Sequence, residues 1–183
     1  LILYFLGGRD ALTSGIVNTF YREIVESWPL ATGDWRHDLE VMAHHIYRAH
    51  VRYPGIANYM LSHNRHRLIQ DLTAGEIDYS LLFFEKSVAA IKAIGFDAAR
   101  TATFAHLIMD FIVANAHATV RHPWPGEHAD FLGTRLSGLD PNKFPATHYV
   151  RENLVRLNAS EAFAAGLNLI MEALEFEFHE GMK

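Results

Sequence analysis

The feature that most constrains the fold of this chain is the spacing of its apolar residues. They recur every three or four positions over long windows, and Gly, Pro and Asp separate one window from the next. This spacing places apolar side chains on one face of an α-helix, whereas a half-buried strand alternates apolar and polar residues. Because strand patterns are almost absent, the sequence predicts an all-α fold.

The residues that flank these windows predict where the helices begin and end. Asp34 and Asp97 have side chains that cap helix N-termini, while Pro54 and Gly95 are residues that end helices. The stretch 121–145 is rich in Pro, Gly, Asp and His and has no helical period, so we expect a long loop that is functional, is mobile or contains a short helix. The predicted helices span 9–26, 34–53, 54–63, 78–94, 97–120, 146–157 and 159–178.

Each predicted helix has an apolar stripe that we expect to face the core. The helix 97–120 is apolar nearly all round, so one of its faces is also expected to contact a partner. The inward stripes are Leu12, Ile16, Phe20 and Ile24 in the first helix, Leu39, Met42 and Ile46 in the second, and Leu81, Phe84, Val88 and Ile91 in the helix 78–94.

The composition excludes several functional classes. Half of the 183 residues are apolar and a fifth are charged, which is typical of a folded cytoplasmic protein. The chain has no cysteine, so it has neither disulfides nor a thiolate site. A net charge of −5 disfavours nucleic-acid binding by these residues themselves. We expect no membrane contact, because the most apolar stretch carries His106 and Asp110 in its interior.

Twelve histidines raise the question of a metal site. We nevertheless expect no metal and no cofactor, and a helical metal-dependent enzyme stays only as an alternative. Ser14 and Ser80 lie in no motif resembling a catalytic triad, so we expect no enzyme. The pairs at one-turn spacing are Glu40 and His44, His63 and His66, and His106 and Asp110.

The start of the chain resembles the end of the helix-turn-helix in TetR-like transcriptional regulators. The resemblance covers residues 2–12, although the family's tyrosine position falls on Leu3, with Tyr4 one place later. Four further segments resemble the same family in the same order. They are Asp34-Trp35-Arg36 with Arg52-Tyr53-Pro54-Gly55, then Ala93-Ile94-Gly95-Phe96, then Phe144-Pro145, and finally residues 163–175 with Phe163, Gly166-Leu167, Ile170 and Leu174-Glu175.

The resemblance implies a homodimeric regulator with two parts. Residues 1–8 would be the remnant of a recognition helix, whose missing N-terminal domain binds operator DNA. Residues 9–183 would form the effector-binding and dimerisation domain, with 9–26 as the connecting helix. Arg9 would meet a DNA phosphate, or would be an exposed arginine without that role.

The last helix predicts a dimer interface, because small residues lie beside large apolar ones on its amphipathic face. The helices 97–120 and 159–178 of each subunit would then form a four-helix bundle with those of a second copy. The interface residues that we predict are Phe163, Leu167, Ile170, Met171 and Leu174.

The resemblance also implies a mostly apolar small-molecule effector inside the helical core. A Met, Ile or Phe at helical spacing is more often plain core, and His106 and Asp110 could simply bond to each other. The tetracycline repressor's metal-contacting histidine falls on Met60, which disfavours a metal-chelate ligand. The candidate ligand-binding residues are Met42, Ile46, Met60, His63, Phe84, Ser87, Val88, His106 and Asp110.

These observations predict a ligand-responsive transcriptional regulator, a repressor that leaves its operator when a small molecule binds the helical core. The alternative is a dimeric helical binding or scaffold module that senses no ligand.

Overall fold

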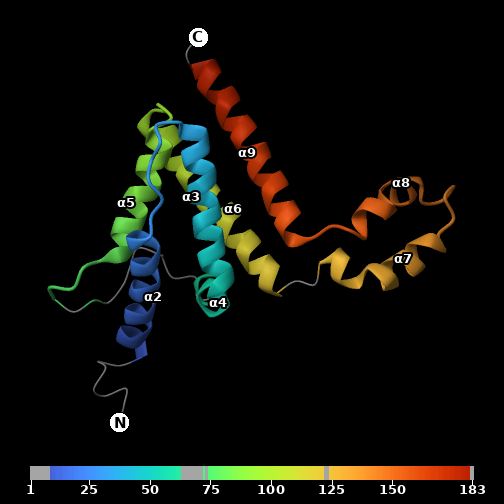
Figure 1. Ribbon diagram of the computed structural model, residues 1–183, viewed down its shortest axis with the longest axis horizontal. Helices are drawn as coiled ribbons and strands as arrows, with labels where there is room; N and C mark the ends of the chain where they lie inside the picture. The colour runs from blue at the N-terminus through green and yellow to red at the C-terminus, as the bar shows by residue number, and fades with distance from the viewer. Residues whose placement is uncertain (1–8, 63–71, 73, 122–123, 182–183) are drawn as a thin grey trace.

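The computed structural model describes residues 9–62, 72, 74–121 and 124–181, and the side chains of 11–60, 72, 74–121 and 124–179. Every regular element in these ranges is helical, which confirms the predicted all-α fold. Figure 1 labels the elements. In chain order they are α2 (Arg9–Glu26), α3 (Trp35–Arg52), α4 (Pro54–Ser62), α5 (Tyr79–Lys92), α6 (Ala98–Arg121), the short 3₁₀ helix η1 (Pro125–His128), α7 (Ala129–Ser137), α8 (Pro145–Leu154) and α9 (Ala159–Gly181).

Local capping explains why the predicted helix starts are confirmed. The Asp34 carboxylate accepts from Arg36 N at 3.0 Å and His37 N at 3.3 Å, and the Asp97 carboxylate accepts from Arg100 N at 2.8 Å. These bonds satisfy backbone donors that a helix N-terminus leaves without partners. Gly95 follows α5 with φ 106°, a left-handed conformation that glycine adopts without strain.

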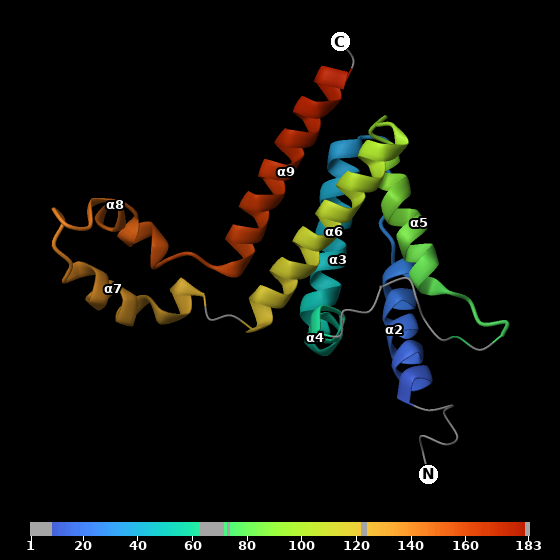
Figure 2. The same cartoon turned by 180° about the vertical axis from the view of Figure 1, so that it is seen from behind.

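The stretch 121–145 contains a helix, which was one of our three expectations for it. Elements η1, α7 and α8 form an arm, residues 124–157, that projects away from the other helices in both Figure 1 and Figure 2. Its base is closed where Gly126 N donates to Leu157 O at 3.0 Å, and a Cβ at Gly126 would lie 3.1 Å from that oxygen. Within the arm, α7 contacts both α8 and η1. No residue of α7 or α8 is buried.

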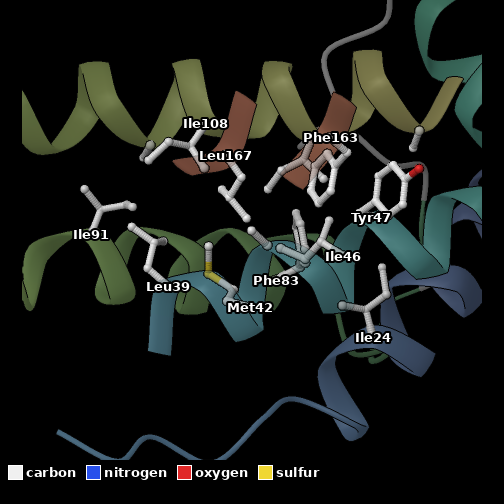
Figure 3. Packing of buried hydrophobic residues seen from close by; sticks show 14 of the residues in the cluster. Ile24, Leu39, Met42, Ile46, Tyr47, Phe83, Ile91, Ile108, Phe163 and Leu167 are labelled. Atoms are coloured by element: carbon white, nitrogen blue, oxygen red, sulfur yellow. The ribbon is translucent and has the colours of Figure 1, made fainter. Parts of the chain in front are cut away.

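The core lies between α2, α3, α5, α6 and α9, and α3 contributes six buried residues to it. Figure 3 shows α3 and α5 facing α6 and α9 across this core. At Gly166 of α9, a Cβ would come within 2.8 Å of the Phe111 ring, so glycine allows α9 and α6 to approach closely.

Two predicted core stripes are only partly right, because Phe20, Ile24 and Ile91 are buried as predicted whereas other members of the stripes are exposed. On α2, Ile16 is 51% exposed whereas Val17 is buried. On α5, Leu81 and Phe84 are exposed, and Phe83 is buried in place of Phe84. Consecutive helical residues point about 100° apart, so a run of adjacent apolar residues offers two possible stripes. Packing against the neighbouring helices decides between them.

The predicted dimer residues of α9 have another role within the subunit. Phe163, Leu167, Met171 and Leu174 are at most 3% exposed and belong to the chain's own core, and Ile170 is partly buried against it. The amphipathic stripe is therefore used to pack α9 on α6 and α3. The opposite face of α9 exposes Leu169 and Phe176.

Polar contacts also hold α9 against α3. The Arg36 guanidinium donates to Glu175 at 2.7 Å, to Glu172 at 2.8 Å and to Asn168 at 3.2 Å. The hydrogen bond to Glu172 raises the pKa of Arg36 above its ordinary value. Such bonds between a fixed guanidinium and two carboxylates define the register of the two helices.

Candidate ligand-binding core

Four aromatic side chains meet where α2, α3 and α5 converge. The rings of Tyr21 and Phe83 have centroids 4.8 Å apart, and the Phe20 ring meets His50 edge-on at 4.9 Å. All four residues are at most 8% exposed. We call Phe20, Tyr21, His50 and Phe83 the aromatic centre.

The aromatic centre has polar groups at its edges. The Tyr21 hydroxyl donates to the Met60 sulfur of α4 at 3.9 Å, a weak acceptor. His50 Nδ1 donates to Ile46 O at 2.9 Å, because a carbonyl oxygen only accepts. Ser87, which is 2% exposed, donates to Phe83 O at 2.8 Å. The combination of flat apolar surfaces with a few oriented polar groups suits a small organic ligand better than acid–base chemistry.

Neither a metal centre nor a membrane span is present in the part of the chain that the structure describes. No three His, Asp or Glu residues there are grouped closely enough to hold an ion. None of the described helices is both long and apolar enough to cross a bilayer.

Comparison with known families identifies the domain. The family described as "Tetracyclin repressor-like, C-terminal domain" matches residues 29–177, which is most of the chain. The chain belongs to this family. The predicted resemblance to TetR-like regulators is therefore confirmed.

Solved structures share the fold of this tetracyclin repressor-like domain. The TetR family protein ActR from Streptomyces coelicolor, in complex with actinorhodin, superposes with a TM-score of 0.77 at 20% identity, over 97% of this chain and 80% of that one. Apo ActR superposes with a TM-score of 0.74 at 19% identity, over 96% of this chain and 78% of that one. SCO7222, a TetR from the same organism, superposes with a TM-score of 0.68 at 21% identity, over 91% of this chain and 76% of that one. A comparison with curated protein sequences finds no significant match.

The tetracyclin repressor-like domain brings five of the predicted ligand residues to one core. Met42 and Ile46 are at most 1% exposed, Ser87 is 2% exposed, and Met60 and Val88 pack against the same cluster. This places them together, and their contact with a ligand stays a prediction.

The other predicted residues lie elsewhere or outside the described part. Phe84 is 47% exposed, because Phe83 takes the inward position. His106 Nε2 lies 3.2 Å from Asp110 Oδ2 on an exposed face of α6, with the two side chains 75% and 49% exposed. This corrects their inward placement and matches the alternative in which they bond to each other. His63 and the side chain of Arg9 lie outside the described residues.

Sequence reasoning missed Tyr21, His50 and Phe83 as members of the centre. Their signal was present in the apolar set Val17, Tyr21 and Ile24, which also follows helical spacing and rivals the stripe that we chose on α2. His50 gave no such signal, because a histidine near a helix C-terminus ordinarily lies in solvent, where its charged form interacts favourably with the helix dipole.

Proposed function

We propose that this domain senses a small molecule for a homodimeric transcriptional repressor of the cytoplasm. An effector that binds in the aromatic centre releases the protein from its operator. Residues 2–12 resemble the end of a helix-turn-helix, and a part of that kind would make the DNA contact. Membership of the tetracyclin repressor-like family supports the regulatory role.

One observation carries the sensing proposal. Phe20 and Tyr21 come from α2, which starts directly after residues 1–8, and they contact His50 of α3, Phe83 of α5 and Met60 of α4. A ligand that separates these side chains changes the position of α2 relative to the core. Since α2 leads to the DNA-reading part, the ligand distinguishes two orientations of that part and shifts their populations.

The lining of the centre indicates the class of effector. Tilted and edge-on rings, with Met42 and Met60 in the same apolar cluster, favour a flat, mostly apolar molecule, and the Tyr21 hydroxyl and Ser87 favour one or two polar substituents on it. ActR, which has the same fold, has been solved with actinorhodin and with (S)-DNPA. We therefore propose aromatic compounds with hydroxyl or carbonyl groups as the first to test.

The exposed apolar residues of α6 and α9 support the homodimer. Leu107 of α6 is 56% exposed, and Leu169 and Phe176 of α9 are 71% and 64% exposed. Exposed large apolar residues on two helices that contact each other are typical of a subunit interface. The arm adds two further exposed aromatic residues, Phe131 and Tyr149, which are 71% and 86% exposed.

The test combines ligand binding with operator binding on the intact protein. Aromatic compounds that raise its melting temperature are tested for release of the operator in a fluorescence anisotropy titration. We expect Tyr21→Phe to weaken ligand binding and leave operator affinity unchanged, because it removes only a hydroxyl from the centre. Tyr149→Phe on the arm is the matched control. If compounds that stabilise the protein leave operator affinity unaltered, the sensing proposal is wrong.

A further inference from the structure

A groove lies on the outside of the domain, between the end of α2 and the last turns of α3. Its volume is about 250 Å³, and it is separate from the aromatic centre in its lining residues. One wall comes from α2 and the residue after it, and the other from α3. The lining residues are Glu23, Ile24, Ser27, His45, Arg48, Ala49 and Arg52.

The groove has a defined shape because its two walls are bonded to each other. His45 Nε2 donates to Ile24 O at 3.1 Å, since the carbonyl oxygen only accepts. The small side chains of Ser27 and Ala49 leave the space between the helices open. At the other end, Arg52 Nη1 donates to Glu23 Oε1 at 3.1 Å, and the Tyr53 hydroxyl donates to Glu23 Oε2 at 2.7 Å.

The charges in this groove do not cancel. Both oxygens of Glu23 are already occupied, and the hydrogen bond to Glu23 raises the pKa of the Tyr53 hydroxyl. Arg48 donates through Nε to His44 O at 3.1 Å, which fixes the plane of its guanidinium. Among the residues that the structure describes, Arg48 makes no ion pair. One positive charge is therefore left without a carboxylate partner.

We propose that this groove binds a small oxyanion, a phosphate or carboxylate group, through the guanidinium of Arg48. The planar fork of an arginine matches the two oxygens of such a group, and it keeps its charge at every physiological pH. Arg52 is paired with Glu23, so Arg48 supplies the net positive charge of the groove, and Ala49 offers a small apolar surface beside it. An anion that binds the folded protein and not the unfolded chain stabilises the fold.

The test uses inorganic phosphate and acetate as probes on the intact protein. Each is titrated calorimetrically against a chloride background of equal ionic strength, so that general screening is the same in every sample. We expect millimolar binding of at least one probe and a rise in melting temperature with its concentration. Binding of phosphate alone assigns the groove to phosphate-bearing ligands, and binding of acetate alone assigns it to carboxylates.

Two variants of Arg48 and one control decide whether the groove is the site. Arg48→Gln weakens binding by about tenfold or more, which corresponds to the loss of one charge-assisted hydrogen bond. Arg48→Lys keeps the charge without the fork and binds with intermediate affinity. Arg135→Gln changes an exposed arginine of α7 and leaves binding unaltered. The proposal is overturned if neither probe binds, if Arg48→Gln binds like the unmodified protein, or if Arg135→Gln weakens binding equally.

Discussion

The ring of Phe163 on α9 stacks on the ring of Tyr47 on α3, with centroids 4.0 Å apart and an angle of 13° between the planes. Phe111 of α6 stacks near the other side at 5.5 Å, and His44 meets Phe163 edge-on at 5.2 Å (Figure 3 shows Phe163 beside Tyr47). Three helices distant in sequence are thus joined by one side chain that is 1% exposed.

Truncation of this ring should destabilise the domain strongly. We expect Phe163→Ala to lower the free energy of unfolding by about 3 to 5 kcal/mol, because it removes buried surface and leaves a cavity between α3, α6 and α9. Urea denaturation followed by circular dichroism measures the change. Leu30→Ala, at a position that is 92% exposed, should stay within about 0.5 kcal/mol of the unmodified protein. Equal losses for both variants would contradict the role given to Phe163.

Asp38 should contribute stability that acid removes. Its carboxylate accepts from Thr32 N at 2.8 Å, from Thr32 Oγ1 at 2.7 Å and from Gly33 N at 3.1 Å, and the bond from Thr32 N contributes most to lowering the pKa of Asp38. A lowered pKa in the folded state means that this stability is present above the unfolded value of about 3.9 and is lost as pH falls through the folded value.

We expect Asp38→Asn to lower the melting temperature by a few degrees at pH 7, and the difference from the unmodified protein to shrink below about pH 4. Scanning calorimetry between pH 7 and 3 measures both effects. Asp130→Asn, on the exposed arm, serves as the control. A difference that stays constant down to pH 3 would show that the Asp38 charge is not the cause.

His44 should make the domain less stable as pH falls below neutrality. Burial lowers the pKa of His44, Arg48 lowers it further, and Glu40 partly opposes both. The unfolded chain therefore takes up this proton more readily, and stability decreases as pH falls from about 6.5 through the lower folded value. We expect His44→Gln to reduce the loss of stability between pH 7 and 5, measured by urea denaturation, whereas His148→Gln on α8 leaves it unchanged.

Leu169 should contribute to the proposed dimer, although it contributes little to the fold. We expect Leu169→Glu to weaken self-association by about tenfold or more while the melting temperature of the monomer stays unchanged, since the residue is 71% exposed. Sedimentation equilibrium measures the association. Leu30→Glu introduces the same charge in the loop before α3 and should have no effect. A compact monomer at micromolar concentration for the unmodified protein would defeat the dimer itself.

The candidate site was only partly predictable. Met42, Ile46 and Ser87 could be placed toward the core because their helices have well-defined starts and a clear apolar period. Phe83 and Phe84 are neighbours that both fit an apolar stripe, and contacts with the rings of Tyr21 and Trp28, which are distant in the sequence, make Phe83 the buried one. His106 and Asp110 lie one turn apart on α6 and contact each other, so neither side chain requires a partner in the core.

The sequence alone determined the fold class and the approximate limits of the helices other than η1 and α7, because these depend on interactions within a few residues. Asp34 and Asp78 bond to backbone groups two and three positions away, and Gly95 ends α5 through its own φ angle. Only the tertiary structure decided which of two possible apolar stripes is buried on α2 and on α5. The stripe from Phe163 to Leu174 would suit either a core or a dimer interface. It is core because Phe163 stacks on Tyr47 of α3 and Phe111 of α6, and because Gly166 lets α9 approach α6 closely. Packing of this kind depends on residues that are distant in the chain.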